Sequence, residues 1–146
     1  VVDDQGRRLL DAGDPERQPV LSPPLAYLVH NVLSDEPARW PSLGYPNLLE
    51  IGRPAGAKMG ATADGSQTWS AGHTPQRLVI TWMGFPDGTA PAAQLDPRLS
   101  AGLWHALIQF ASQDLPAANW TEPAGIRRMA VCSPPSTARR WTTRCC

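Results

Sequence analysis

Residues 56–84 read GAKMGATADGSQTWSAGHTPQRLVITWMG, and this stretch decides the fold class. Three runs within it, residues 56–63, 67–73 and 77–84, have the composition and spacing of short strands. The turns between them are Ala63-Asp64-Gly65 and Thr74-Pro75. Because such short connections join antiparallel neighbours, we expect a meander of at least three strands. The third run is almost continuously apolar, which predicts a strand covered on both faces.

A helix is expected on each side of this stretch. Before it, Ser22 can cap a helix, Pro23 suits the first turn, and apolar residues recur at helical spacing, which predicts an amphipathic helix over residues 23–34. After it, a second apolar stripe predicts a helix over residues 97–112 with Trp104 in the core. The stripe residues are Leu25, Leu28, Val29, Val32 and Leu33, then Leu103, Trp104, Leu107, Ile108 and Ala111. The predicted fold class is α+β, an antiparallel sheet flanked by an N-terminal and a C-terminal helix.

The remaining segments are interpreted from their turn and linker composition. Residues 1–18 indicate a small hairpin followed by a polar linker. Residues 36–47 are rich in proline and glycine and are predicted to be a loop. Residues 126–131 favour a short strand within a C-terminal extension over residues 115–146.

Length and charge restrict the function. The chain has 146 residues, enough for one domain or part of one. Its 13 basic and 13 acidic side chains cancel, so the basic surface required for nucleic acid is absent and no nucleic acid partner is expected. No apolar run is long enough to span a membrane and no signal peptide opens the chain. A targeting segment or anchor of an exported protein would therefore lie upstream of Val1.

The candidate metal ligands and disulfide partners are three cysteines and three histidines. Cys132, Cys145 and Cys146 lack the paired spacing of a zinc site, and a disulfide from Cys132 to one of the other two would favour an oxidising compartment. Free thiols are the alternative. The three histidines have no metal-ligand spacing either, so no metal is expected and His73 is given a structural role.

One lysine, Lys58, stands among twelve arginines, at the start of the first predicted strand. The pKa of a lysine shifts readily where that of an arginine does not, so this position suits a site that needs a tunable cation. Gly60, two residues on, either marks a bulge or leaves room for a ligand backbone. A solvated lysine at a sheet edge is the alternative interpretation.

The block from Arg53 to Gly84 resembles the third motif region of class A penicillin-binding proteins. That family has Lys-Thr-Gly-Thr-Thr, then Trp, then Gly-Tyr-Thr-Pro, and a strand ending in Trp-Val-Gly. This chain matches every interval without a gap, with Lys58-Met59-Gly60-Ala61-Thr62, Trp69, Gly72-His73-Thr74-Pro75 and Trp82-Met83-Gly84. The resemblance covers most of the chain, because its flanks are similar too. These are the helix after Ser22, Arg39, the Trp104 helix, and Pro123-Ala124-Gly125-Ile126 leading to Cys132.

The resemblance implies a partial penicillin-binding protein or serine β-lactamase fold, with residues 19–114 as the C-terminal portion of a transpeptidase domain. It implies acyl transfer on peptidoglycan stem peptides outside the cytoplasmic membrane, with β-lactams as ligands of the complete domain and no cofactor. Lys58 would supply charge near the substrate carboxylate and the proton network, and Gly60 would let the substrate backbone lie close. Ala61 would offer its backbone N–H to the oxyanion hole, with Thr62 as a nearby hydroxyl.

Two residues differ from the family pattern, and two of the family's motifs are absent from this chain. Met59 and Ala61 replace hydroxyl residues, and a lost charge-assisted hydrogen bond costs about 1.5–3 kcal/mol of binding. By strand alternation, Met59 faces away from Lys58 and Gly60. The nucleophile motif Ser-x-x-Lys is absent, since Ala55 stands three residues before the lone lysine, and no Ser-x-Asn occurs. We expect this chain alone to be catalytically inert. A non-catalytic module that binds peptidoglycan or a partner protein is the alternative.

Overall fold

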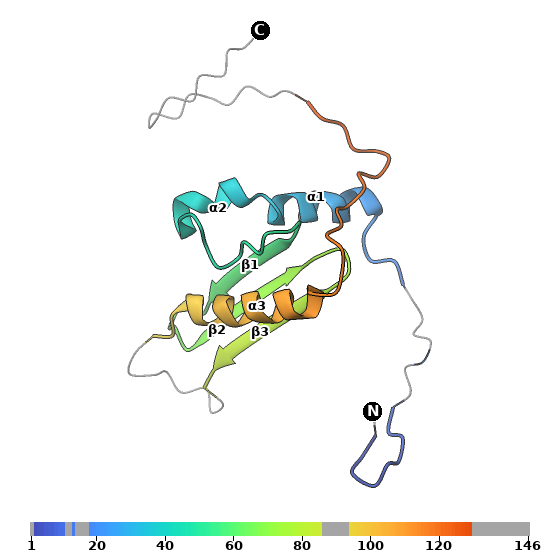
Figure 1. Cartoon of the computed structure of the whole chain (residues 1–146), viewed down its shortest axis with the longest axis vertical. Helices are drawn as coiled ribbons and strands as arrows, with labels where there is room; N and C mark the ends of the chain where they lie inside the picture. Colours follow the sequence, from blue (N-terminus) through green and yellow to red (C-terminus); the bar gives the residue numbers. More distant parts are fainter. Residues whose placement is uncertain (1, 11–12, 14–17, 86–93, 130–146) are drawn as a thin grey trace.

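The computed structural model describes residues 2–10, 13, 18–85 and 94–129, and its centre is a three-stranded sheet. The strands are β1 (Gly56–Ala61), β2 (Gln67–His73) and β3 (Leu78–Gly84), antiparallel and in that order (Figure 1). The predicted meander is confirmed. Strand ends fall within two residues of the expected positions.

Helix α3 (Pro97–Ser112) covers one face of this sheet (Figure 1). Asp96 caps the helix, because its carboxylate accepts a hydrogen bond from the Arg98 N–H at 2.9 Å. Trp104 and Ile108 are completely buried, and the Trp104 indole N–H donates to the Val79 carbonyl at 3.2 Å. The predicted helix and the core position of Trp104 are confirmed.

Hydroxyl groups fill much of the interface between α3 and the sheet. Ser70 Oγ and Ser100 Oγ lie 3.0 Å apart, and Thr81 Oγ1 donates to the Ser100 carbonyl at 2.9 Å. All three side chains are buried, so these hydrogen bonds replace bonds to water that folding removes. They tie the first turn of α3 to β2 and β3 together.

Helix α1 (Pro23–Leu33) forms where the sequence predicts it, one residue shorter. Ser22 occupies the capping position, but its side chain makes no capping hydrogen bond. The helix contacts β1 beside Gly56, where His30 is its one buried residue. The apolar stripe that predicts this helix is mostly exposed rather than packed on the sheet. The exposed residues are Leu25, Leu28, Val29 and Val32.

The loop predicted over residues 36–47 is wrong for its first part, which forms helix α2 (Glu36–Leu43). Asp35 caps α2, since its carboxylate accepts from the Ala38 N–H at 3.2 Å. One proline lies in the first turn, where it removes no helical hydrogen bond, and Gly44 ends the helix with a φ of 82°. Strong signals at both ends therefore outweigh Pro41 in the interior.

Strand β3 is covered on one face only, so the expectation of a strand buried on both faces is wrong. Thr81 is buried beneath α3, whereas Ile80 is 57% exposed on the other side. The register places Ile80 and Lys58 opposite Ala71 of β2, so the same exposed face extends to β1. We call this surface the bare sheet face. It comprises Lys58, Gly60, Trp69, Leu78, Ile80 and Trp82.

In the described residues before α1 and after α3, the chain forms no β-strand. Near the N-terminus, Val2 and Arg8 form an isolated antiparallel bridge. The strand predicted over residues 126–131 is wrong for residues 126–129, which form no strand, and residues 130–131 lie outside the described part of the chain. Among the described helices, none has both the length and the apolarity needed to cross a membrane.

Candidate functional site

Lys58 lies on β1, the strand at one edge of the sheet, with its side chain on the bare sheet face. The residue is exposed, and its ammonium group donates to the Met59 carbonyl at 2.6 Å. Gly60 lies next along the same face, and a Cβ added there would meet no atom within 4 Å. The lysine and the open space at the glycine are therefore neighbours on one accessible strand.

The free edge of β1 offers backbone donors beside this lysine. The Thr62 N–H donates to the Gln67 carbonyl at 3.0 Å, so residue 62 bonds inward to β2. Because bonding alternates along an antiparallel edge strand, the N–H groups of Met59 and Ala61 point away from β2. The backbone donor of Ala61 is thus available at the edge of the sheet.

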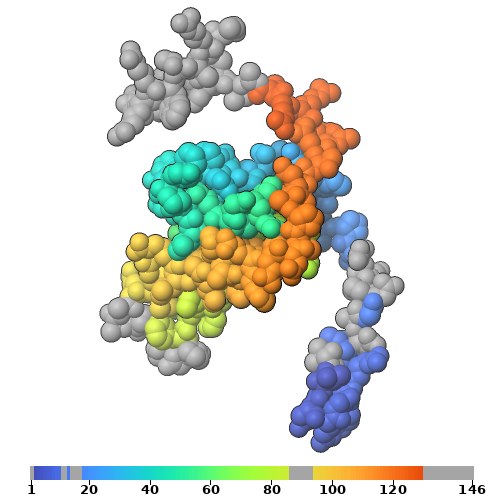
Figure 2. Space-filling model, viewed as in Figure 1, coloured from blue at the N-terminus to red at the C-terminus, as the bar shows by residue number. Residues whose placement is uncertain are grey.

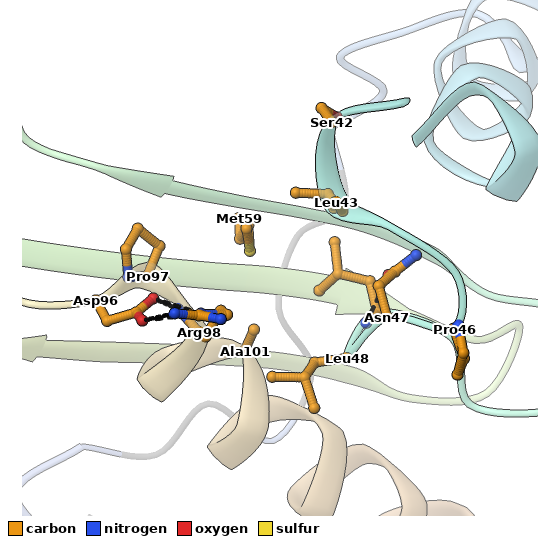
Figure 3. A pocket seen from close by; sticks show the side chains of 11 residues that line it. Ser42, Leu43, Pro46, Asn47, Leu48, Met59, Asp96, Pro97, Arg98 and Ala101 are labelled. Atoms are coloured by element: carbon orange, nitrogen blue, oxygen red, sulfur yellow. Dashed lines mark hydrogen bonds and ion pairs between the residues drawn. The ribbon is translucent and has the colours of Figure 1, made fainter. Parts of the chain in front are cut away.

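Two adjoining pockets line this edge. The smaller, of about 220 Å³, is lined by Lys58 and Gly60 together with Arg39 of α2 and Pro97 of α3. The larger, of about 470 Å³, shares several of its walls and extends toward the Asp96–Arg98 ion pair, as Figure 3 shows. The walls common to both are Ser42, Leu43, Leu49, Met59 and Pro97. Lys58 therefore borders a depression between α2 and the start of α3.

Arg39 is a second cation of this site, and the spacing of residues in the sequence motif does not predict it. Its Nη1 donates to the Leu33 carbonyl at 2.6 Å, which ties α2 to the end of α1. Its Nε and Nη2 are buried, and they have no hydrogen-bond partner among the described residues. In the sequence Arg39 matches only the flank of a family pattern, and only the fold of α2 brings it to the lysine.

Thr62 follows β1 in the tight turn to β2. Its hydroxyl accepts from the Gln67 N–H at 3.0 Å and lies 3.3 Å from Ser66 Oγ. Hydrogen bonds from the Thr62 side chain and from the backbone and hydroxyl of Ser66 lower the pKa of Asp64 to about 2. This hydroxyl is thus part of a hydrogen-bonded turn.

Met59 faces away from Lys58 and Gly60, as strand alternation predicts. Its side chain packs against the hydrophobic core and lines both pockets at the free edge. The loss of a hydroxyl at this position therefore alters the core side of β1 rather than the face that carries the lysine.

The remaining candidate residues do not gather here. His30 and His73 contact each other at the far end of β1, with His30 Nδ1 3.3 Å from His73 Nε2, and His105 Nδ1 lies 3.0 Å from the Leu48 carbonyl. Within the described ranges, no group of three metal-ligating side chains occurs. Cys132, Cys145 and Cys146 lie outside the described residues, so their pairing stays a prediction.

In comparisons with known proteins, the chain is similar to a limited region of penicillin-binding proteins. Penicillin-binding protein 1A of Clostridium perfringens is 26% identical over 133 residues, which is 90% of this chain and 15% of that protein. Penicillin-binding protein 1A of Vibrio cholerae is 24% identical over 145 residues, or 83% of this chain and 18% of that protein. The chain thus spans less than a fifth of the length of either relative. No family model and no solved structure matches it.

Proposed function

We propose that this chain is the C-terminal portion of a penicillin-binding transpeptidase domain that acts in peptidoglycan cross-linking outside the cytoplasmic membrane. Its part is to supply the substrate-binding strand and a backbone donor of the oxyanion hole. The serine nucleophile belongs to another part of the parent protein. Stem peptides and β-lactams are then ligands of the complete domain.

The observation that carries the proposal is the arrangement at the free edge of β1. Lys58 lies beside a depression, Gly60 leaves its face open, and the Ala61 N–H points outward. An extended peptide can add to such an edge by main-chain hydrogen bonds while a neighbouring cation attracts its carboxylate. Arg39, on the opposite wall, adds positive charge to the same depression.

The pocket itself lacks an activated nucleophile. Ser42 is the one hydroxyl side chain among the residues that line the smaller pocket. Its Oγ donates to the Arg39 carbonyl at 3.0 Å, a bond within α2. A serine needs an adjacent base to attack an acyl group, and no described base hydrogen-bonds to Ser42.

The bare sheet face supports the view that the described part is incomplete as a domain. Trp69, Ile80 and Trp82 are exposed beside Lys58, although water-facing surfaces of monomers rarely gather such large apolar side chains. A further part of the same domain, carrying the nucleophile, would cover these residues and approach Lys58 from that side.

A fluorescent penicillin tests the missing nucleophile directly. The purified 146-residue chain is incubated with the reagent, denatured and separated, so that only covalent adducts are detected. We expect no labelling, because Ser-x-x-Lys is absent. A covalent adduct on this chain would contradict the proposal.

A second candidate is a non-catalytic module that holds peptidoglycan peptides or a partner protein. Met59 and Ala61 favour it, since both replace hydroxyl residues of the family pattern. In this case the chain alone binds muropeptides, and Lys58→Ala weakens binding more than Lys58→Arg, which keeps the charge. Muropeptide binding that survives Lys58→Ala unchanged would exclude a groove built around that lysine.

A further inference from the structure

Three aromatic side chains from distant segments meet at the end of the sheet away from Thr62. His30 Nδ1 of α1 lies 3.3 Å from His73 Nε2 of β2. The Trp120 ring, from the segment that follows α3, lies on His30 with centroids 3.5 Å apart and planes inclined by 31°. The same indole meets His73 edge to face, with centroids 5.4 Å apart. We call these residues the His30–His73–Trp120 cluster.

The packing between this cluster and β1 leaves little spare room, while a pocket of about 380 Å³ adjoins all three side chains on another side. His30 is 8% exposed, and a Cβ added at Gly56 would lie 2.9 Å from His73 Cε1 and 3.3 Å from His30 Nδ1. The glycine is therefore what lets both imidazoles lie over β1.

The segment that carries Trp120 also meets α1 further on, where Glu122 and Arg128 line a pocket with Tyr27. After α3 it runs along the end of the sheet and past α1 (Figures 1 and 2). The Gln76 side chain donates to the Pro116 carbonyl at 3.1 Å, and Gly125 lies near Pro24. Between these two points the Trp120 ring contacts both the helix, at His30, and the sheet, at His73.

The hydrogen bond between the two imidazoles depends on the number of protons they hold. With both rings neutral, or with one proton added, one nitrogen can donate and the other accept. With both rings protonated, neither nitrogen can accept, and two positive charges would face each other at this distance.

Among the described residues, no carboxylate hydrogen-bonds to either imidazole. Tyr27 of α1 lies near His30, with ring centroids 6.4 Å apart. Glu36, Glu50 and Arg53 line a neighbouring pocket with His30, and within the described residues none of the three hydrogen-bonds to either imidazole. Burial lowers the pKa of His73, and burial together with the charge of His73 lowers the pKa of His30.

We propose that the His30–His73–Trp120 cluster is a proton-operated latch, which holds residues 117–123 against α1 while the pair shares a hydrogen bond and frees them when both imidazoles are protonated. Because folding lowers both pKa values, the stabilisation is fully present above the ordinary histidine value of 6.5. It decreases as the pH falls below that value toward the folded pKa values. The latch is independent of the proposed catalytic role of the parent protein.

Backbone ¹⁵N relaxation of the full chain between pH 8 and pH 5 tests the latch. We expect the order parameters of residues 118–122 to fall from about 0.85 to below about 0.6, while those of α3 stay near 0.85. His73→Tyr keeps an aromatic ring and introduces a hydroxyl, but it removes one of the two titrating imidazoles, so residues 118–122 should stay ordered at pH 5. His105→Gln removes a histidine outside the cluster and should leave the transition unchanged.

A second measurement uses the unaltered chain and so does not depend on the folding of a variant. The ring signals of His30 and His73 should titrate below pH 6.5, each responding to the protonation of the other. The proposal is overturned if residues 118–122 remain rigid at pH 5, if the transition persists in His73→Tyr, or if the two rings titrate independently at the ordinary value.

Discussion

Two glycines of the sheet have opposite surroundings. A Cβ at Gly60 would enter open space, whereas a Cβ at Gly72 would collide with the Trp104 ring and lie 2.8 Å from the Gly56 carbonyl oxygen. Gly72 thus allows the close approach of α3 to β2. Gly60 is free to serve a ligand, because the fold does not need its missing side chain.

We therefore expect Gly72→Ala to lower the free energy of unfolding by about 1–3 kcal/mol through overpacking. Gly60→Ala is its control and should change this free energy by no more than about 0.5 kcal/mol. Urea denaturation followed by circular dichroism measures both. Equal destabilisation by the two variants would show that Gly60 has a structural role.

At this scale the sequence predicts some residues and not others. Lys58 and Gly60 are visible because the chain has a single lysine and a family pattern surrounds it. The pairing of His30 with His73 and the position of Arg39 beside Lys58 are not visible, since both depend on packing between segments far apart in the sequence.

Among the elements, α3 holds the core together through one side of its surface. Trp104 is completely buried and donates a hydrogen bond to Val79, while Leu107, three residues on, is 42% exposed. The apolar stripe of α3 is therefore wider than the part of the helix that is buried against the sheet, because Leu103 and Leu107 remain exposed.

Truncating Trp104 and Leu107 to alanine should distinguish the buried side of α3 from its exposed side by the stability that each variant loses. Trp104→Ala is expected to cost about 3–5 kcal/mol of stability, because it leaves a cavity beneath the sheet. Leu107→Ala should cost less than about 1 kcal/mol, since little apolar area is lost. Thermal unfolding monitored by calorimetry compares them, and similar losses would contradict the orientation of α3.

Helix α2 illustrates a limit of composition as a predictor. Proline and glycine content favours a loop over residues 36–47, yet Asp35 and Gly44 provide the two end signals of a helix. Strand β3 illustrates another limit, because an apolar run reports hydrophobicity and not which surface covers it. The meander and α3 are predictable since turns and helical spacing are local features.

At the scale of the whole molecule, the described part exposes many large apolar side chains. In the described part, the outer edges of β1 and β3 pair with no other strand. On the bare sheet face, large exposed side chains of β2 and β3 lie beside Lys58 of β1. Exposed edges and apolar faces favour association with other chains. The isolated chain should therefore self-associate.

Ile80→Ser should reduce this association without unfolding the chain, because Ile80 is exposed. We expect a smaller weight-average mass in sedimentation velocity and a change in stability of no more than about 0.5 kcal/mol. Val79→Ser, on the opposite face of the same strand, is the matched control. It packs against the core, so it should destabilise the fold by more than about 1 kcal/mol. Association that Ile80→Ser leaves unchanged would argue against the bare sheet face as the contact.

The most direct test of the central claim is to place this chain in a complete penicillin-binding protein. A chimera replaces the matching 133 residues of penicillin-binding protein 1A of Clostridium perfringens, and the rate of covalent labelling by a fluorescent penicillin is measured. We predict that the chimera is labelled and that Lys58→Ala slows labelling roughly 10- to 150-fold, the loss of one hydrogen bond to a charged group. Arg127→Ala, an exposed cation away from β1, should have no effect. A folded chimera that is not labelled, or one labelled equally fast without Lys58, would contradict the account.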